Sequence, residues 1–117
     1  MAIKLEDHLF ELEEGFWLRG PEFYQPNLAY TALMVLPEPA GVLLDDDITS
    51  SLTEAARWAR VEMEEHRLLE LGERATLITY KGTAVGAEGP TYRARASSVY
   101  VYDGNAWKLA FHQQTPL

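Results

Sequence analysis

The C-terminal end of the chain constrains its fold more than any other segment, because it predicts a β-hairpin. Residues 91–102 are rich in Tyr, Val, Ser and Thr, most of which favour strands. Asp103-Gly104 follows, a dipeptide typical of hairpin turns, and residues 106–114 pair back as a second strand. With further strands at 61–71 and 75–84, the hairpin predicts four long strands in an antiparallel meander.

The first segment of the chain predicts an amphipathic helix over residues 3–18. Leu5, Leu9, Leu12 and Phe16 recur at spacings of four, three and four residues, which places them on one helix face. The solvated remainder of this helix is expected to be mostly acidic and consists of Glu6, Asp7, Glu11, Glu13 and Glu14. Gly20-Pro21 ends the helix, since Pro disfavours a helical residue before it.

The segment between this helix and the meander reads as a loop, two extended pieces and a short helix. Residues 21–26 are a loop, 28–36 a strand and 41–44 a second extended piece. Ser51 and Glu54 fit a capping box for a short helix that reaches about Trp58, although Thr49 or Ser50 could also cap it. Two helices preceding an antiparallel sheet indicate the α+β class.

Composition limits the partners and the chemistry. The 117 residues carry a net charge of −8 and are expected to form a single domain, residues 1–117. An acidic surface repels phosphates, so we expect neither nucleic acid nor a membrane as partner. The absence of cysteine excludes disulfides, thiol nucleophiles and Cys-ligated metals. The first residues lack an apolar signal core, so a cytoplasmic location is expected.

Alternation along the last two strands divides their residues between two faces of the sheet. We align Val99 and Val101 with Trp107, Leu109 and Phe111, which gathers bulky side chains against the helices. The opposite face then carries few charges and includes Tyr92, Ala96, Ser98, Tyr100, His112 and Gln114. Semi-apolar surface of this kind is usually covered. A homodimer with the sheet backs facing each other is therefore predicted, with this set as its interface.

Polar residues interrupt the face that we assign to the core, namely Arg95, Ser97 and Gln113. Such groups either bond to one another and to the backbone or line a cavity that holds water or a ligand. A pocket between sheet and helices for a flat apolar molecule would combine them with the aromatic residues Trp17, Tyr24, Tyr30 and Trp107. Core packing explains the same aromatic residues equally well.

Motifs for catalysis are sparse. His112 is placed at the dimer face, His8 on the acidic helix and His66 in a strand, with no His-Glu-x-x-His or His-x-His spacing. Asp45-Asp46-Asp47 suits a helix N-terminus, but a Ca²⁺ or Mg²⁺ site needs further oxygen ligands. Neither a serine-nucleophile elbow nor a glycine-rich phosphate loop is present. No metal and no cofactor are therefore expected.

The order of these segments is similar to that of the NTF2-like superfamily. It has a helix with Phe16-Trp17, Gly41-Val42-Leu43 leading into a second helix, and then the meander. The closing stretch resembles the SnoaL-like/DUF4440 (ketosteroid-isomerase-like) branch over Tyr92–Tyr102, Asp103-Gly104 and Trp107–Pro116. The resemblance covers nearly the whole chain. It implies a cone-shaped, cystatin-like α+β fold with helices packed on a strongly bent antiparallel sheet, often dimerising through that sheet.

The functions that this resemblance implies are diverse and include ketosteroid isomerases, polyketide cyclases, dehydratases and scaffold domains. The isomerase pattern of a general-base Asp with a Tyr and a protonated Asp has no counterpart here, because Asp7, Asp45, Asp46, Asp47 and Asp103 all lie outside apolar strands. Two hypotheses follow. The cone binds a small hydrophobic molecule, with cofactor-free acid/base chemistry as its enzymatic form. Alternatively, the chain is a non-catalytic homodimeric interaction module with a plugged cone.

Overall fold

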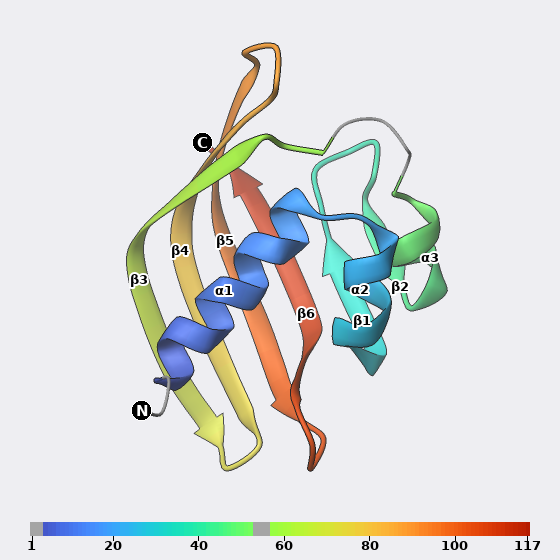
Figure 1. Ribbon diagram of the computed structural model, residues 1–117, viewed down its shortest axis with the longest axis vertical. Coiled ribbons are helices and arrows are strands. Elements are labelled where there is room, and N and C mark those ends of the chain that lie inside the picture. Colours follow the sequence, from blue (N-terminus) through green and yellow to red (C-terminus); the bar gives the residue numbers. More distant parts are fainter. Residues whose placement is uncertain (1–3, 53–56) are drawn as a thin grey trace.

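The computed structural model of the protein describes residues 4–52 and 57–117. Helices and strands follow one another in the order α1 (Leu5–Leu18), α2 (Pro21–Asn27), β1 (Leu28–Val35), β2 (Val42–Leu44), α3 (Asp46–Ser50), β3 (Arg60–Gly72), β4 (Ala75–Val85), β5 (Thr91–Tyr102) and β6 (Trp107–Pro116). The α+β class predicted from the sequence is confirmed (Figure 1).

Six strands form one sheet in the order β2-β1-β6-β5-β4-β3. Strands β3 to β6 are the antiparallel meander that the sequence predicts. The β5–β6 turn forms at Asp103-Gly104, where the Asp103 carboxylate accepts the backbone N–H groups of Asn105 and Ala106, both at 2.8 Å. The strand predicted over residues 28–36 is confirmed as β1. The sequence pattern did not predict its neighbour in the sheet, which is β6, paired in parallel.

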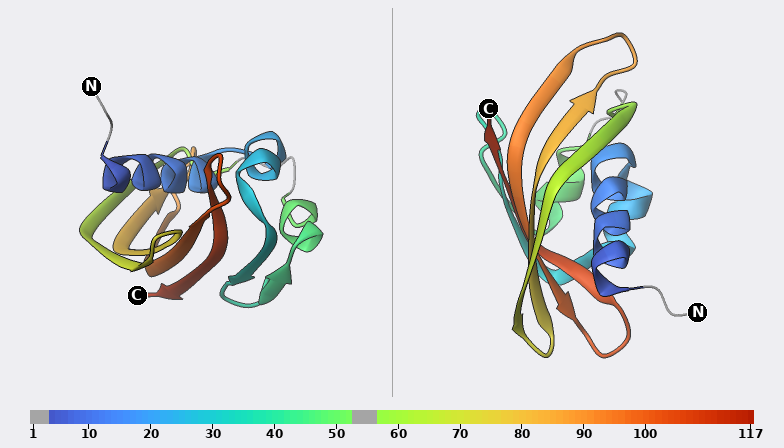
Figure 2. Two further views of the ribbon diagram at one scale, coloured as in Figure 1. Left: turned by 90° about the horizontal axis from the view of Figure 1, so that it is seen from below. Right: turned by 90° about the vertical axis from the view of Figure 1, so that its left-hand side faces the viewer.

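The sheet curls around helix α1, which lies along its concave side (Figure 2). Beside α1, helices α2 and α3 cover the part of the sheet formed by β1 and β2 (Figure 1). Apolar side chains of α1 such as Leu9, Phe16 and Trp17 are buried against inward-facing residues of the strands. The core therefore lies on the concave side of the sheet, and the helices cover only this side.

Residues 21–27 form helix α2 rather than the predicted loop. Pro21 stands at the first helical position, where its missing N–H costs nothing and its fixed φ is already helical. Gly15 of α1 lets the two helices approach, because a Cβ at this position would overlap the ring of Phe23. Among residues 4–52 and 57–117, no helix combines the length and apolar character needed to cross a membrane.

The predicted helix after Ser51 is also displaced. Helix α3 ends at Ser50, and Arg57 and Trp58 lie outside any helix. The remaining positions of that prediction, 53–56, lie outside the described residues. Asp45, the first of the three aspartates, accepts the backbone N–H of Ala32 through Oδ1 at 2.8 Å and so ties this turn to β1.

The faces of β5 and β6 were assigned wrongly. Ala94, Ala96, Ser98 and Tyr100 are buried beneath the helices, whereas Arg93 and Arg95 are exposed on the outside. The physical reason is twofold. Two guanidinium groups cannot be buried without partners, and a bulge between the Tyr100–Leu109 and Val99–Phe111 pairs changes the phase of alternation on β6. Leu109 consequently faces inward and Phe111 outward.

Candidate functional site

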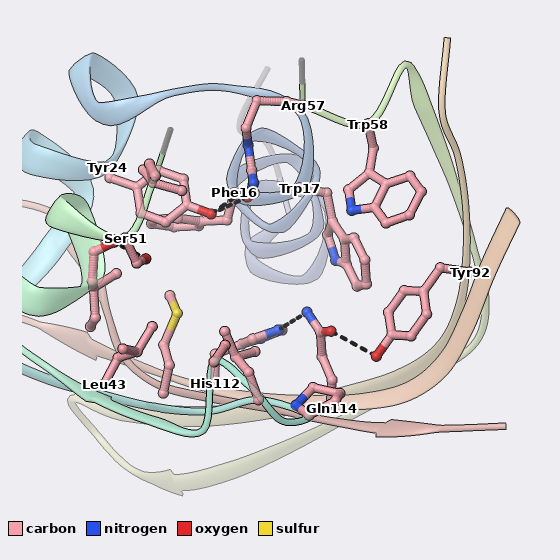
Figure 3. A pocket seen from close by; sticks show the side chains of 16 residues that line it. Phe16, Trp17, Tyr24, Leu43, Ser51, Arg57, Trp58, Tyr92, His112 and Gln114 are labelled. Carbon is pink, nitrogen blue, oxygen red and sulfur yellow. Dashed lines mark hydrogen bonds between the residues drawn. The ribbon is translucent and has the colours of Figure 1, made fainter. Parts of the chain in front are cut away.

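A cavity of about 450 Å³ lies between the sheet and the helices at the α2–α3 end of the molecule. Apolar side chains from α3, β1 and the β1–β2 region form one wall, and aromatic side chains form the other (Figure 3). Trp58 stacks on Tyr92 in the aromatic wall, with ring centroids 5.9 Å apart and planes inclined by 14°. The volume falls in the range typical of small-molecule sites, so the cone is not filled by side chains.

Beneath this cavity lies a fully buried carboxylate, that of Glu13 on α1. Its Oε1 accepts the Tyr100 hydroxyl at 2.7 Å, and its Oε2 accepts the hydroxyls of Tyr80 at 2.5 Å and Ser98 at 2.6 Å. Trp17 Nε1–H donates to the Tyr80 oxygen at 2.7 Å. The Glu13 network, as we call these five residues, thus joins α1 to β4 and β5 with every polar group satisfied.

His112 on β6 links the Glu13 network to the cavity. Its Nδ1 lies 2.7 Å from Ser98 Oγ and 3.1 Å from Glu13 Oε2. Because the Ser98 hydroxyl proton goes to Glu13, the serine oxygen is left to accept from Nδ1–H. The other ring nitrogen, Nε2, then accepts from the Gln114 amide Nε2 at 3.0 Å, on the cavity side (Figure 3).

The Glu13 network holds Glu13 in its ionised form. Burial alone would raise the pKa of this carboxyl, but the hydrogen bond from His112, the positive charge of that ring when protonated, and the hydroxyls of Ser98 and Tyr80 outweigh it. The pKa of Glu13 is therefore lowered from its usual value. A carboxylate beside an imidazole nitrogen fixes the ring orientation and stabilises the imidazolium form.

A second polar group enters the cavity from the helical side, at Arg57. Its guanidinium donates to the backbone oxygens of Arg19 and Phe16 and to the Tyr24 hydroxyl, the last at 2.9 Å. The Tyr24 hydroxyl in turn donates to the Phe16 carbonyl oxygen. Burial raises the pKa of Tyr24 to about 12, although the charge of Arg57 opposes this. Arg57 therefore braces the segment before β3 against α1 and α2.

The predicted pocket residues fall into two groups. Trp17 and Tyr24 line the cavity. Tyr30 is fully exposed, Arg95 pairs with Glu65 at 3.4 Å on the outside, and Gln113 donates to Ser97 on that same outer face. Trp107 packs partly against the core beside Tyr102 and does not line the cavity.

The predicted interface residues face inward instead. Ala96, Ser98, Tyr100 and His112 are buried within the single chain, so they are not available to a second copy. Tyr92, His112 and Gln114 line the cavity. Half of the set that we predicted as the dimer interface thus lines the cavity, because the faces of β5 and β6 are exchanged.

Sequence reasoning missed Glu13, which we expected on the solvated face of the first helix. A usable signal exists, because Glu13 follows Leu9 by four residues and precedes Phe16 by three, which places it on the apolar stripe. Arg57 and Trp58 gave no comparable signal. Within the described residues, no group of three His, Asp or Glu side chains could hold a metal ion.

Comparison with known proteins finds relatives by structure only. No family model matches the chain, and no curated protein matches it. A ketosteroid-isomerase-like protein of Parabacteroides distasonis superimposes with a TM-score of 0.81 at 10% identity, over 97% of this chain and 89% of the other. An NTF2-like protein of unknown function from Prochlorococcus marinus gives 0.78 at 15% identity, over 97% and 94%.

A third similar structure is the association domain of C. elegans CaMKII, with a TM-score of 0.71 at 15% identity over 93% of this chain and 90% of that one. A protein with a cystatin-like fold from Caulobacter vibrioides gives 0.68 at 14% identity, over 95% and 86%. At such identities the likeness concerns the fold and not the reaction. The chain has the NTF2-like, cystatin-like α+β fold, as its resemblance to that superfamily implies.

Proposed function

We propose that the protein binds a small, largely apolar molecule in the cavity and that His112 acts on it as a general acid/base without a cofactor. One observation carries this proposal: the imidazole of His112 connects the cavity wall to the buried carboxylate of Glu13. A carboxylate–imidazole pair at the end of an apolar pocket is an arrangement suited to proton transfer.

The lining of the cavity supports a largely apolar ligand with a polar group. Its walls are mostly aliphatic and aromatic, the polar residues Tyr92, His112 and Gln114 lie together on one side, and Arg57 enters from the helical side (Figure 3). The stacked rings of Trp58 and Tyr92 favour a flat molecule. The ketosteroid-isomerase-like neighbour is compatible with this ligand class through its fold alone.

The position of the ring proton supports Nε2 of His112 as the atom that accepts a proton from the ligand. With the ring proton on Nδ1, Nε2 carries the lone pair, which becomes available to the ligand once the ligand displaces the Gln114 amino group that bonds to it. A C–H or O–H bond of the ligand breaks, an N–H bond forms at Nε2, and the electron pair stays on the ligand as an enolate or alkoxide. Glu13 then faces an imidazolium ion at 3.1 Å. Isomerisation, cyclisation and dehydration all use such a step.

Binding is tested by the melting temperature in a panel of steroid-like and polyketide-like compounds. A ligand at one hundred times its Kd stabilises the folded state by about 2.7 kcal/mol. Ala40→Trp, which adds bulk at the cavity wall from an exposed position, should weaken that response. Ala87→Trp, on an exposed loop outside this cavity, is the matched control. An unchanged melting temperature across the whole panel would overturn the binding proposal.

We also propose, as the second candidate function, that two copies of the chain pair through the outer face of the sheet. The observation behind it is an apolar row that crosses all six strands in register. The row consists of Leu44, Leu33, Phe111, Val99, Leu77 and Leu69. Leu44 and Leu69 at its two ends are 55% and 58% exposed.

We propose that a second copy of the chain covers this apolar row. A two-fold axis near its centre would lay the row of one copy on the row of the other, which is the self-complementary contact of a symmetric dimer. The similar CaMKII domain is an association domain by name, which is consistent with a fold that serves assembly. The cone is open rather than plugged, so pairing through this surface is proposed independently of whether the cavity is catalytic.

A further inference from the structure

The hydrogen bonds at the polar end of the cavity form a chain of three side chains. Gln114 donates from Nε2 to His112 Nε2 at 3.0 Å, and its Oε1 accepts the Tyr92 hydroxyl at 3.0 Å (Figure 3). An amide has one donating and one accepting end. Its orientation is therefore fixed by what each neighbour requires.

The neutral form of His112 fixes one orientation of the amide. Its Nε2 is an acceptor, so Gln114 must present the amino group to the ring and the carbonyl oxygen to Tyr92. The hydroxyl proton of Tyr92 is then used in the bond to Gln114. In this state the Tyr92 oxygen can only accept a hydrogen bond from a bound molecule.

Protonation of His112 reverses each of these requirements. Nε2–H becomes a donor, so the Gln114 amino group can no longer face it. A half-turn of the amide, whose two ends are nearly equal in size, presents Oε1 to the imidazolium and the amino group to the Tyr92 oxygen. The hydroxyl proton of Tyr92 is thereby released toward the cavity.

We infer that Gln114 transmits the protonation state of His112 to Tyr92, so that protonated His112 converts the Tyr92 hydroxyl into a hydrogen-bond donor for an acceptor oxygen of the bound molecule. This inference rests on the proposed function. It assigns Gln114 as a positioning residue and Tyr92 as the group that contacts a carbonyl or enolate oxygen.

Several charged and titratable groups surround His112. Glu13 of α1 contacts it directly, and Tyr80 of β4 and Tyr100 of β5 donate to Glu13. Tyr24 of α2, Tyr92 of β5 and Arg57 from the segment before β3 line the same cavity as His112. The pKa of Glu13 is lowered, and burial raises the pKa of Tyr24, Tyr80, Tyr92 and Tyr100. Arginine stays charged throughout.

We call this coupling of His112 to Tyr92 through Gln114 the relay. It is tested directly by ¹⁵N NMR of the full chain. The imidazole nitrogens of His112 and the side-chain NH₂ of Gln114 are followed through a pH titration. We expect the Gln114 NH₂ signals to shift with the same midpoint as His112, and to do so also in His66→Asn, which removes an exposed histidine elsewhere. Gln114 signals that stay constant while His112 titrates would overturn the inference, whether or not any ligand binds.

Two probes test the consequence for binding. 2-Acetylnaphthalene carries an acceptor oxygen, and naphthalene carries none. Below the His112 midpoint we expect 2-acetylnaphthalene to bind roughly fivefold tighter than above it, the value of one hydrogen bond, with naphthalene unaffected. Tyr92→Phe and Gln114→Met should lose the pH effect and keep naphthalene binding.

The outcomes separate the two proposals. If neither probe binds to the wild type at any pH and the compound panel also leaves the melting temperature unchanged, the proposed binding function fails, and the NMR titration still decides the relay. If both probes bind with no pH effect, the relay fails and the binding proposal stands.

Discussion

Glu13 Oε2 lies 3.1 Å from Nδ1 of His112, so one helix and the last strand of the sheet meet through a carboxylate and an imidazole. Both side chains are nearly inaccessible, at 0% exposure for Glu13 and 8% for His112. The contact fixes the ring at the wall of the cavity and gives the site its polar end. The stability of the fold and the chemistry of the cavity therefore depend on the same pair.

Glu13→Gln should destabilise the protein strongly. The amide keeps the volume of the carboxyl, but its amino group meets hydroxyls and an imidazole N–H that already donate. Loss of one partner in a buried charged network costs about 3 kcal/mol. Urea denaturation measures the change, and Glu14→Gln, at an exposed neighbour, should stay within about 0.5 kcal/mol. Equal effects in the two variants would contradict the role assigned to Glu13.

Acid should unfold the protein through the same carboxyl. The pKa of Glu13 is lower in the folded chain than its usual 4.5, so its contribution to stability is complete above that value. It is lost as the pH falls through the folded pKa. The free energy of unfolding should therefore decline below pH 4.5, and Glu13→Gln should show a shallower decline. Parallel curves for the two proteins would argue against an ionised, hydrogen-bonded Glu13.

Alkali should unfold the protein by ionising its buried tyrosines. Burial raises the pKa of Tyr24 to about 12, and burial and the charge of Glu13 raise those of Tyr80 and Tyr100 well above 10. Since the folded state favours the protonated phenols, the stability they confer is present below pH 10 and is lost as the pH rises through their folded pKa values. Tyrosinate absorbance from these residues should appear together with the loss of far-UV circular dichroism. Their ionisation in a chain that stays fully folded would be inconsistent with their burial.

Pairing through the outer face is tested by Val99→Glu. Val99 stands inside the apolar row between Phe111 and Leu77, and a buried unpaired carboxylate there should dissociate a dimer. Light scattering reports the mass, and Gln25→Glu adds the same charge on an exposed position of α2 as a control. A wild-type monomer at micromolar concentration, or a dimer that survives Val99→Glu, would refute this interface. Ala96→Glu is not a suitable test, because Ala96 is buried under the helices.

The meander and its closing turn could be predicted because their signals are local. Alternation, β-branched and aromatic residues and Asp103-Gly104 act within a few residues. Helix α2 was missed because Pro21 was interpreted only as the end of the preceding helix, although Pro is favoured at the first helical position. The parallel pairing of β1 with β6 is a long-range contact without a local signature.

The inward face of the sheet was missed for a different reason. Strict alternation keeps Leu109 and Phe111 together, and the bulge that separates them leaves no mark in the sequence. Arg93 and Arg95 could have corrected the assignment of the β5 faces, since two arginines on one face of a strand indicate that this face contacts solvent rather than the core. The same reversal brings His112, Gln114 and Tyr92 into the cavity.

The most direct measurement of the central claim is proton exchange on a bound ketone. 2-Tetralone, a flat molecule with acidic α-protons, is incubated with the protein in D₂O and followed by ¹H NMR. We expect saturable deuterium incorporation that falls about a hundredfold or more in His112→Asn and persists in His66→Asn. A wild-type rate equal to that of buffer, with tetralone bound at saturation, would contradict acid/base catalysis by His112.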